Sequence, residues 1–552
     1  SLKCNVGGTN NVAVGYESLK ANTTGDFNIA IGKDALKANT ADSNTAIGLC
    51  AMVCNTTGGV NVAVGYEALE QNTTAAENTG VGYRALKGNT TGCQNASFGT
   101  CSVYTNSTGD ANTGVGYKAL FANTTADSNT AVGKDALLAN TTASQNVAIG
   151  SLSSVTNTTG CKNTAVGHAS FYNNSTGDNN TALGNFALND NTTADDNTAV
   201  GYFALKANTT GANNTAVGRC ALASNTDSRQ NTGIGNIALI DNTEGEFNTA
   251  VGSQSLADNT TADCNVAVGY TSLRKNTTGA NNTAVGTFSL ACNTTGAGNV
   301  AVGSLALEDN TIGCQNTSVG YTSLRNNTEG NFNAAFGRDS MNVNTTGDEN
   351  TAMGTCALVY NTTGYSNVSV GFKSLICNTT GYRNVGVGVL AGDDITTGYE
   401  NTLIGYNASP NLSTGDRNVT IGDIGSLGSR LFNLTTEDNR FLAGHPSITN
   451  AYVKVAWTVT SDARDKTNFG TVPHGLDFVN QLEPVSFQFK KSREDDTPHG
   501  DVRYGFKAQD IMALEGDNPV IIDDEEPDHL KYKGEHLVPV LVNAIKELSE
   551  TN

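Results

Sequence analysis

The chain has 552 residues, of which 38% are hydrophobic, 7% aromatic and 15% charged, and 61 are glycine. Its formal net charge of −20 argues against nucleic acid as a partner, because phosphate binding requires clustered Lys and Arg. No run of about 18 apolar residues occurs, so membrane insertion is not expected. The start, Ser1-Leu2-Lys3-Cys4, has neither an initiator Met nor a signal-peptide core, and we interpret it as processed or truncated.

Most of the sequence is a 17-residue repeat of the form Asn-(Thr/Val)-Ala-Val-Gly-x-x-(Ala/Ser)-Leu-x-x-Asn-Thr-Thr-Gly-x-x. Its first Asn, position 1 of the unit, stands at 11, 28, 44, 61 and 78 and then every 17 residues to 418, which makes 25 copies. One copy is a residue short, at Asn39-Thr40-Ala41. Disordered low-complexity chains do not keep such a register, so the repeat indicates a folded array.

Each part of the unit predicts a local structure. Positions 2–4 place a small residue between two β-formers and predict a short strand, and the Leu of position 9 anchors a second segment. Position 5 is Gly in all 25 copies, as expected where the backbone needs a positive φ or a close approach. Asn-Thr-Thr-Gly at positions 12–15 predicts a turn that uses left-handed Asn and Gly and bonds from the Thr hydroxyls to backbone.

These elements predict a mainly β fold, a parallel β-solenoid shaft over residues 1–427. Seventeen residues are too few for a helix, a strand and two turns, whereas stacked β coils bury apolar columns against their neighbours. All eight prolines lie at or after Pro410, which fits a continuous ladder that has no place for a residue without an N–H. With one Val and one Leu per coil the core is thin, so we expect lateral association of chains and favour a trimer.

The repeat resembles the head region of trimeric autotransporter adhesins, whose coils carry a comparable Asn-x-Ala-(Val/Ile)-Gly motif in a parallel β-roll. It is also similar to repeats in the tail fibres of phages and large viruses.

Two residue classes within the repeats have alternative interpretations. The twelve cysteines recur in a few repeat columns without a CxxC pair or a nearby His. Free thiols at small-residue positions are therefore favoured over disulfides, which could join chains, and over a metal site. Asn-Thr-Thr is formally a glycosylation sequon, but a structural ladder of Asn and Thr explains its place in most copies.

The repeat decays after Asn401, and a connector is expected over residues 428–460. It contains Phe441-Leu442-Ala443-Gly444 and an alternating segment, 451–459, that predicts a strand. Residues 461–552 have a different composition, with 10 basic and 19 acidic residues, and are predicted to be a separate domain. Its last part, Leu537–Leu548, has helical spacing and is expected to pack against symmetry mates. The acidic run 523–526 is interpreted as a solvated loop rather than a cation site.

The C-terminal domain closely resembles the intramolecular chaperone domain of the S74 peptidase family, found at the ends of viral tail spikes and fibres. The resemblance covers 461–552 and rests on Ser461-Asp462-Ala463-Arg464-Asp465-Lys466, then Gly505-Phe506-Lys507-Ala508-Gln509, then the terminal helix. It implies a small α+β domain that trimerises, templates the folding of the upstream fibre and cuts the chain between Ser461 and Asp462.

The residues at the implied cleavage point suit that chemistry. A Ser hydroxyl becomes a good nucleophile when a nearby base takes its proton, and a partly buried Lys with a lowered pKa is such a base. Ser461 and Lys466 are therefore the predicted nucleophile and base, with Asp462 and Arg464 shaping the site. The reaction would be a single self-cleavage without cofactor or metal. The alternative is that Ser461 and Lys466 are ordinary loop residues.

The leading hypothesis is a structural tail or surface fibre of a virion that attaches to a host. Its expected partners are two further copies of the chain, upstream virion proteins and a cell-surface receptor. A rival is a cellular trimeric adhesin, which an upstream signal peptide and membrane anchor would distinguish. A second rival is a glycan-degrading tailspike, which needs paired carboxylates. The repeats show no copy-specific acidic pair and no aromatic sugar platform.

Overall fold

The computed structural model describes residues 1–423, 432–445, 448, 451–452, 454, 461–490, 495–525 and 527–551. They divide into two units, Ser1–Asp348 and Glu349–Asn552. This division falls inside the repeats, whereas the sequence places its boundaries at 427 and 460. The expected end of the repeats at 427 lies outside the described residues.

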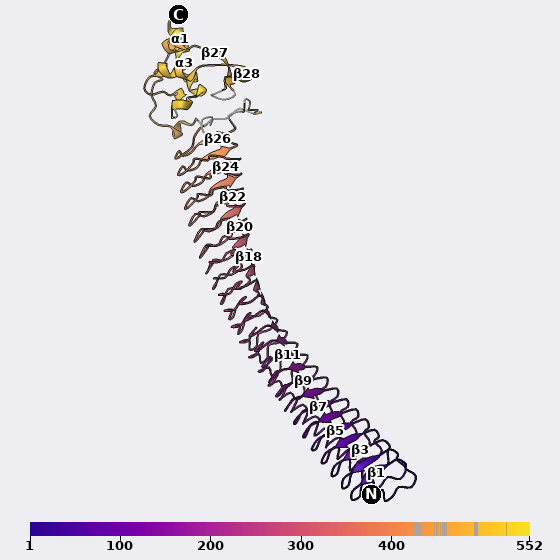
Figure 1. The fold of residues 1–552 in the computed structure, drawn as a ribbon. Helices are drawn as coiled ribbons and strands as arrows, with labels where there is room; N and C mark the ends of the chain where they lie inside the picture. Colours follow the sequence, from indigo (N-terminus) through magenta and orange to yellow (C-terminus); the bar gives the residue numbers. More distant parts are fainter. Residues whose placement is uncertain are drawn as a thin grey trace. The chain divides into compact units, whose positions relative to one another are not determined.

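In both units each repeat contributes one three-residue strand (Figure 1). In the first unit they are β1 (Val12–Val14), β2 (Ile29–Ile31), β3 (Thr45–Ile47), β4 (Val62–Val64), β5 (Thr79–Val81), β6 (Ala96–Phe98), β7 (Thr113–Val115), β8 (Thr130–Val132), β9 (Val147–Ile149), β10 (Thr164–Val166), β11 (Thr181–Leu183), β12 (Thr198–Val200), β13 (Thr215–Val217), β14 (Thr232–Ile234), β15 (Thr249–Val251), β16 (Val266–Val268), β17 (Thr283–Val285), β18 (Val300–Val302), β19 (Thr317–Val319) and β20 (Ala334–Phe336). In the second they are β21 (Thr351–Met353), β22 (Val368–Val370), β23 (Val385–Val387), β24 (Thr402–Ile404), β25 (Val419–Ile421) and β26 (Phe441–Ala443).

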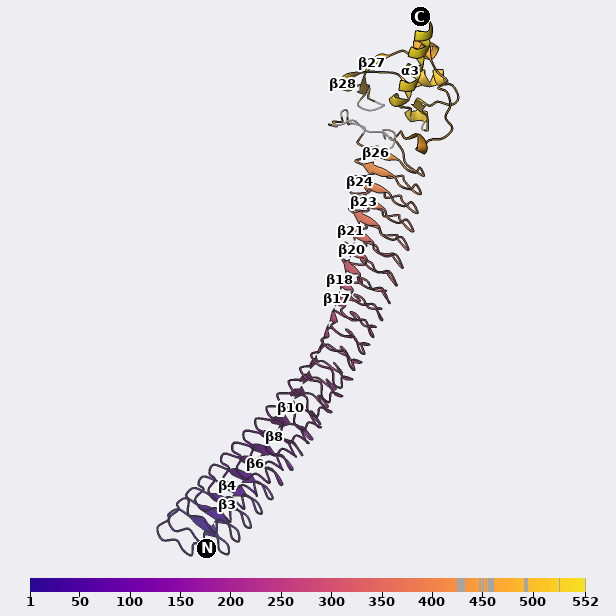
Figure 2. The same cartoon turned by 180° about the vertical axis from the view of Figure 1, so that it is seen from behind.

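Neighbouring strands pair in parallel with equivalent positions opposite each other, as in Thr164↔Thr181 and Ala165↔Ala182. The chain thus returns to the same place after each repeat, and successive strands lie side by side in both views (Figures 1 and 2). The predicted parallel β-solenoid with 17-residue turns is confirmed.

The solenoid core is narrower than the sequence suggests. In β2–β25 the middle residue is buried and the residues on either side are half-buried or exposed, as in Thr198–Val200. The interior holds the small residues of positions 3 and 8 and the Leu of position 9, such as Ala63, Ala68 and Leu69, each 0% exposed. The expectation that the position-4 Val belongs to the core is wrong, because the interior has room only for a small side chain opposite the Leu.

Two columns of Asn, at position 1 in all copies and at position 12 in the first 22, hold the turns together. In a representative turn, Asn61 Nδ2 and Asn72 Nδ2 both donate to the carbonyl of Ala75, at 2.9 and 3.0 Å. Each Asn also bonds to its equivalent one turn back. Asn61 N donates to Asn44 Oδ1 at 3.0 Å and Asn72 Nδ2 donates to Asn55 Oδ1 at 2.7 Å. The side chain of Asn72 is 0% exposed, so the folded turn offers no access for glycosylation and the predicted Asn ladder is confirmed.

Left-handed backbone occurs at positions other than those predicted. Positions 7, 9 and 17 have φ near +50° to +60° in nearly every copy, although they are rarely Gly. The Asn of position 12 and the Gly of position 15 have no positive φ, so the left-handed turn at Asn-Thr-Thr-Gly is wrong. The Thr hydroxyl bonding is confirmed but runs between turns, as in Thr73 Oγ1 to Thr90 O at 2.9 Å.

The position-5 Gly has both the positive φ and the close backbone approach that the sequence predicts. Its φ lies between 130° and 144° in the first 24 copies. A Cβ on Gly65 would stand 2.2 Å from the carbonyl oxygen of Gly82 in the next turn.

The ladder continues one strand further than the 25 repeats. Strand β26 pairs in parallel with β25, with Val419 opposite Phe441. It lies in the segment expected to be a connector. Residues 453 and 455–459, where a strand is predicted, lie outside the described residues.

The C-terminal part of the second unit is the small α+β region predicted. Its elements are η1 (Ala463–Asp465), α1 (Leu476–Gln481), β27 (Val485–Lys490), β28 (Pro498–Gly505), α2 (Ala508–Glu515), β29 (Ile522–Asp523), η2 (Pro527–His529), β30 (Lys531–Tyr532) and α3 (Gly534–Thr551). β27 pairs antiparallel with β28 and β29 with β30. The core contains Phe478, Ile511, Ile521, Ile522, Leu537 and Val540. Among the described residues, no helix is long and apolar enough to cross a membrane.

Replacing a position-5 Gly is expected to destabilise the shaft. In Gly201→Ala an alanine would have to adopt a φ of 135°, and its Cβ would stand 2.5 Å from Gly218 O. The substitution should lower the free energy of unfolding by at least about 2 kcal/mol. The matched control is Gly59→Ala, whose Cβ would meet only Asp42 O, at 3.3 Å. Thermal unfolding followed by circular dichroism should show a lower midpoint for Gly201→Ala alone. Equal midpoints for the two variants would contradict this.

The left-handed position 17 predicts a stabilising substitution. Val60 is β-branched, 60% exposed and has a φ of 61°, a conformation that costs an L-residue about 1–2 kcal/mol and that Asn tolerates. Val60→Asn should therefore raise the thermal midpoint. The reciprocal change, Asn179→Val at the same position of another copy (φ 58°), should lower it. Shifts of the same sign would rule out the backbone explanation.

Candidate functional site

The structure brings together the two residues predicted to form a catalytic pair. Lys466 Nζ donates a hydrogen bond to Ser461 Oγ at 2.7 Å. A single 3-10 turn, η1, separates them, and Lys466 ends it by donating its backbone N–H to Ala463 O. The turn folds the five-residue spacing of the sequence into direct contact, the arrangement that proton transfer from Ser to Lys requires.

Asp462 and Arg464 form the turn itself. Asp462 caps η1, and its Oδ1 accepts from Arg464 N at 2.9 Å and from Arg464 Nε at 3.0 Å. The Arg464 side chain, and secondarily its backbone N–H, hold the pKa of the Asp462 carboxyl below its usual range. Asp462 in turn raises the pKa of the Arg464 guanidinium. Both residues therefore fix the backbone beside the Ser461–Asp462 bond, whereas the Ser461 hydroxyl bonds to Lys466.

The pair is not buried as the chemistry anticipates. Every residue from 461 to 470 is exposed, so the Lys466 side chain is open to solvent in the single chain. The partly buried Lys of the sequence-based mechanism is thus not present within one chain. The catalytic roles of Ser461, Lys466, Asp462 and Arg464 stay predictions.

The cysteines and acidic groups form no metal centre among the described residues, where no group of three or more His, Cys, Asp or Glu is placed to hold an ion. All twelve cysteines are free thiols within this chain. Burial raises the pKa of the Cys54 and Cys377 thiols.

The acidic run at 523–526 is not simply a solvated loop. Asp523 belongs to β29 and lies 3.7 Å from Lys533 Nζ. Glu525 Oε1 lies 2.6 Å from Arg440 Nη2, on the last solenoid turn. Glu526 lies outside the described residues.

The comparisons with known proteins identify the segment that contains the Ser–Lys pair. Residues 461–519 match the family model of Peptidase S74, described as chaperone of endosialidase. The resemblance stated for the C-terminal domain is thus confirmed over most of its length. Neither the curated proteins nor the solved structures gave a match.

The endosialidase-chaperone segment includes all four predicted site residues, η1, α1, β27, β28 and α2. The hairpin β29–β30 and helix α3 follow the matched residues. Helix α3 has two apolar faces. Leu537, Val540 and Ala544 are buried against its own domain, whereas Leu541, Ile545 and Leu548 are exposed.

One surface feature was missed in the sequence. Tyr365, Tyr382 and Tyr399, all at position 16 of successive copies, stack with ring centroids 4.8 Å apart and planes within 3° of parallel. Arg383 and Arg417 lie beside the stack, and Arg417 Nη2 donates to Tyr399 Oη at 2.9 Å. The repeats therefore do contain a copy-specific aromatic cluster. Its signal was three Tyr spaced 17 residues apart in a column that elsewhere carries mainly small or acidic residues.

Proposed function

We propose that the protein is a virion tail or surface fibre for host attachment, whose C-terminal domain trimerises it, directs its folding and then cuts itself off between Ser461 and Asp462. The observation that carries the proposal is the order of the parts. A long parallel β-solenoid followed by an endosialidase-chaperone segment is a tail-fibre-like or tailspike-like architecture. Trimerisation, attachment and cleavage are the proposed steps.

Association of chains is supported by the strand face that points out of the solenoid. The outward positions 2 and 4 carry no charged residue in any of the strands β1–β25, although 15% of the chain is charged. Position 4 is apolar throughout, and many of its side chains are 36–57% exposed, among them Val14, Phe98 and Met353. Within each unit these side chains form a continuous apolar stripe. Such a stripe is unusual on a free surface and typical of an interface.

The exposed face of α3 supports association independently. Val538, Leu541, Ile545 and Leu548 are 38–65% exposed and follow the 3-4-3 spacing of a coiled-coil seam. The inward face of the same helix already packs in the domain core, so the seam is available to other copies. β-branched residues alternating with Leu suit a coiled coil of two helices as well as one of three. The choice of a trimer rests on the family resemblance.

A chaperone is needed because the repeats are nearly identical. Long-range β pairing nucleates slowly, and equivalent turns of different chains can pair out of register. Joining the chains at one end fixes the register and raises their local concentration before the shafts associate. Removing the chaperone afterwards would trap the assembled fibre kinetically.

Cleavage and assembly are coupled in this proposal. Within one chain Lys466 is exposed, and desolvation that favours its neutral, base form must therefore come from a neighbouring copy. Cleavage would then follow trimerisation rather than precede it.

Replacing either residue of the pair is expected to abolish cleavage. On a denaturing gel the wild type should release a fragment of roughly 90 residues, the length that follows Ser461, whereas Ser461→Ala and Lys466→Ala should not. Arg464→Lys keeps the charge and should slow cleavage less. Because the pair needs neighbours, the wild-type rate per chain should rise with protein concentration during folding. A wild type that stays intact under folding conditions would refute autoproteolysis.

Disrupting the α3 seam is expected to prevent assembly. Ile545→Asp places a charge at a 65% exposed seam position and should shift the native mass from trimer to monomer, because a desolvated charge opposes association. Val502→Asp changes a similarly exposed residue (63%) on β28 and should leave the mass unchanged. Mass measurement by light scattering distinguishes the cases. A monomeric wild type would contradict the association, and a dimeric one would contradict the trimer.

A further inference from the structure

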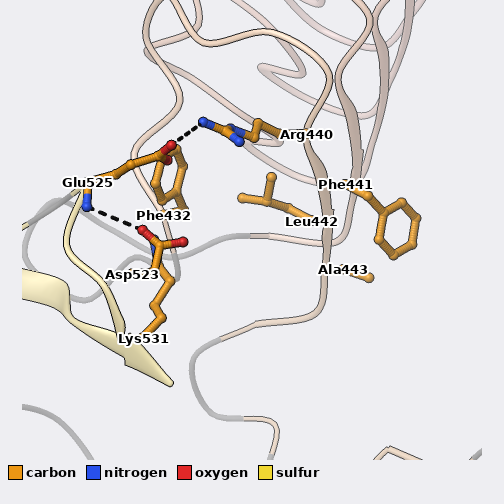
Figure 3. A pocket seen from close by; sticks show the side chains of 8 residues that line it. All are labelled: Phe432, Arg440, Phe441, Leu442, Ala443, Asp523, Glu525 and Lys531. Atoms are coloured by element: carbon orange, nitrogen blue, oxygen red, sulfur yellow. Dashed lines mark hydrogen bonds and ion pairs between the residues drawn. The ribbon is translucent and has the colours of Figure 1, made fainter. Parts of the chain in front are cut away.

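The last solenoid turn departs from the repeat at its most regular position. Position 1 is Asn in all 25 copies, and in the final turn it is Arg440. The backbone still continues the ladder, because Arg440 N donates to Asn418 Oδ1 at 2.9 Å. The guanidinium, however, is directed toward Glu525 of the C-terminal region (Figure 3).

The partner of Arg440 belongs to the loop that follows β29. Arg440 Nη2 lies 2.6 Å from Glu525 Oε1. A second contact runs alongside, where Lys531 Nζ of β30 stands 3.7 Å from the ring centroid of Phe432. Phe432 belongs to the last turn and is only 8% exposed. The last turn thus contributes a cation, Arg440, that pairs with Glu525 beside the hairpin. The hairpin contributes a second cation, Lys531, that lies over the Phe432 ring of the turn.

The hairpin that makes these contacts is anchored in the core of the C-terminal region. Ile521 and Ile522 are 2% and 0% exposed and belong to the core of the C-terminal region. The Asp523–Lys533 ion pair joins its two arms. Between the hairpin and the last turn lies a cavity of about 430 Å³. Asp523, Glu525 and Lys531 line it on one side, and Phe432, Arg440 and strand β26 line it on the other (Figure 3).

The contact meets a general need of a β-solenoid. The end of a β ladder is a site for pairing with another chain unless a further element covers it. Here the apolar interior ends at Leu442, which is half-buried. Strand β26 has a partner on one side, β25, and the hairpin faces the residues that end the ladder.

We propose that the β29–β30 hairpin is the surface through which the chaperone region holds the last solenoid turn, so that shaft folding starts there and proceeds toward the N-terminus. The proposal rests on the chaperone role proposed above and names the contact by which it acts. Stacked repeats fold by nucleation and propagation, and the first turn is the costly one. A template that orders one turn therefore affects all those that follow.

The strength of the contact suits a transient template. An exposed ion pair contributes little to the stability of a finished fold, and the Arg440 and Glu525 side chains are 40% and 49% exposed. Its effect should therefore appear in the yield and rate of folding rather than in the stability of the mature fibre.

A charge exchange in the full-length protein tests the proposal. Arg440→Glu and Glu525→Arg should each lower the yield of protease-resistant shaft after refolding by several-fold, because like charges then face each other. The double exchange should restore at least half of the wild-type yield. The matched control is the Arg325–Glu308 pair, which lies 2.7 Å apart within the shaft. Arg325→Glu should leave the yield within twofold of wild type.

Deletion of residues 461–552 separates this proposal from the one on which it depends. If the deletion abolishes the shaft while both single exchanges fold normally, the hairpin contact is refuted and the chaperone role stands. Failure of the double exchange to recover would refute the pairing of Arg440 with Glu525. If the deleted chain folds as well as the full one, the chaperone role itself is refuted.

Discussion

One carbonyl in each turn, that of position 15, governs the architecture. It belongs to a buried residue, such as Ala75, which is 1% exposed, and a buried carbonyl without a hydrogen bond is costly. Two Asn amides, from positions 1 and 12, supply its hydrogen bonds, as Asn61 and Asn72 do for Ala75. The amide oxygens then accept bonds from the adjacent turn. A single polar group thus closes each turn and links it to its neighbours, which explains why Asn dominates a sequence with few large apolar residues.

The close spacing of turns follows from the same arrangement and decides which residues face outward. Stacking at the strand separation leaves no room for a Cβ at position 5, and the narrow interior holds a small residue at position 3 where position 9 is Leu. The β-branched residues that favour a strand must then lie outside it. A turn that satisfies its polar groups internally therefore leaves its apolar strand residues on the surface, where a neighbouring chain can cover them. The same arrangement of side chains therefore both holds each turn together and favours association with other chains.

Features that depend on the same residue type in every copy could be predicted from the sequence, and other features could not. Gly at position 5 and Asn at position 1 are invariant, and position 12 is Asn in the first 22 copies, because each of these copies meets the same constraint, so comparing copies reveals it. The orientation of Ala63 and Val64 could not be read in this way, since alternation in a three-residue strand fits either face. The left-handed residues were hidden too, because Val60, Glu77 and Gln94 share a backbone conformation but no side-chain property. At the C-terminus, the motif order located Ser461 and Lys466, but their exposure depends on packing that the local sequence does not encode.

Departures from the repeat are the places where function can be sought. Replacing Asn by Arg at position 1 removes the amide that would close a turn, which is tolerable only where the ladder ends. At Arg440 the side chain instead reaches Glu525 of another element. The Tyr365–Tyr382–Tyr399 stack likewise replaces a column that caps backbone N–H groups elsewhere, as Asp127 does for Asp110. Every turn could have the same sequence. Where a position carries a different residue that the turn itself does not need, a contact with something outside the turn is the best explanation.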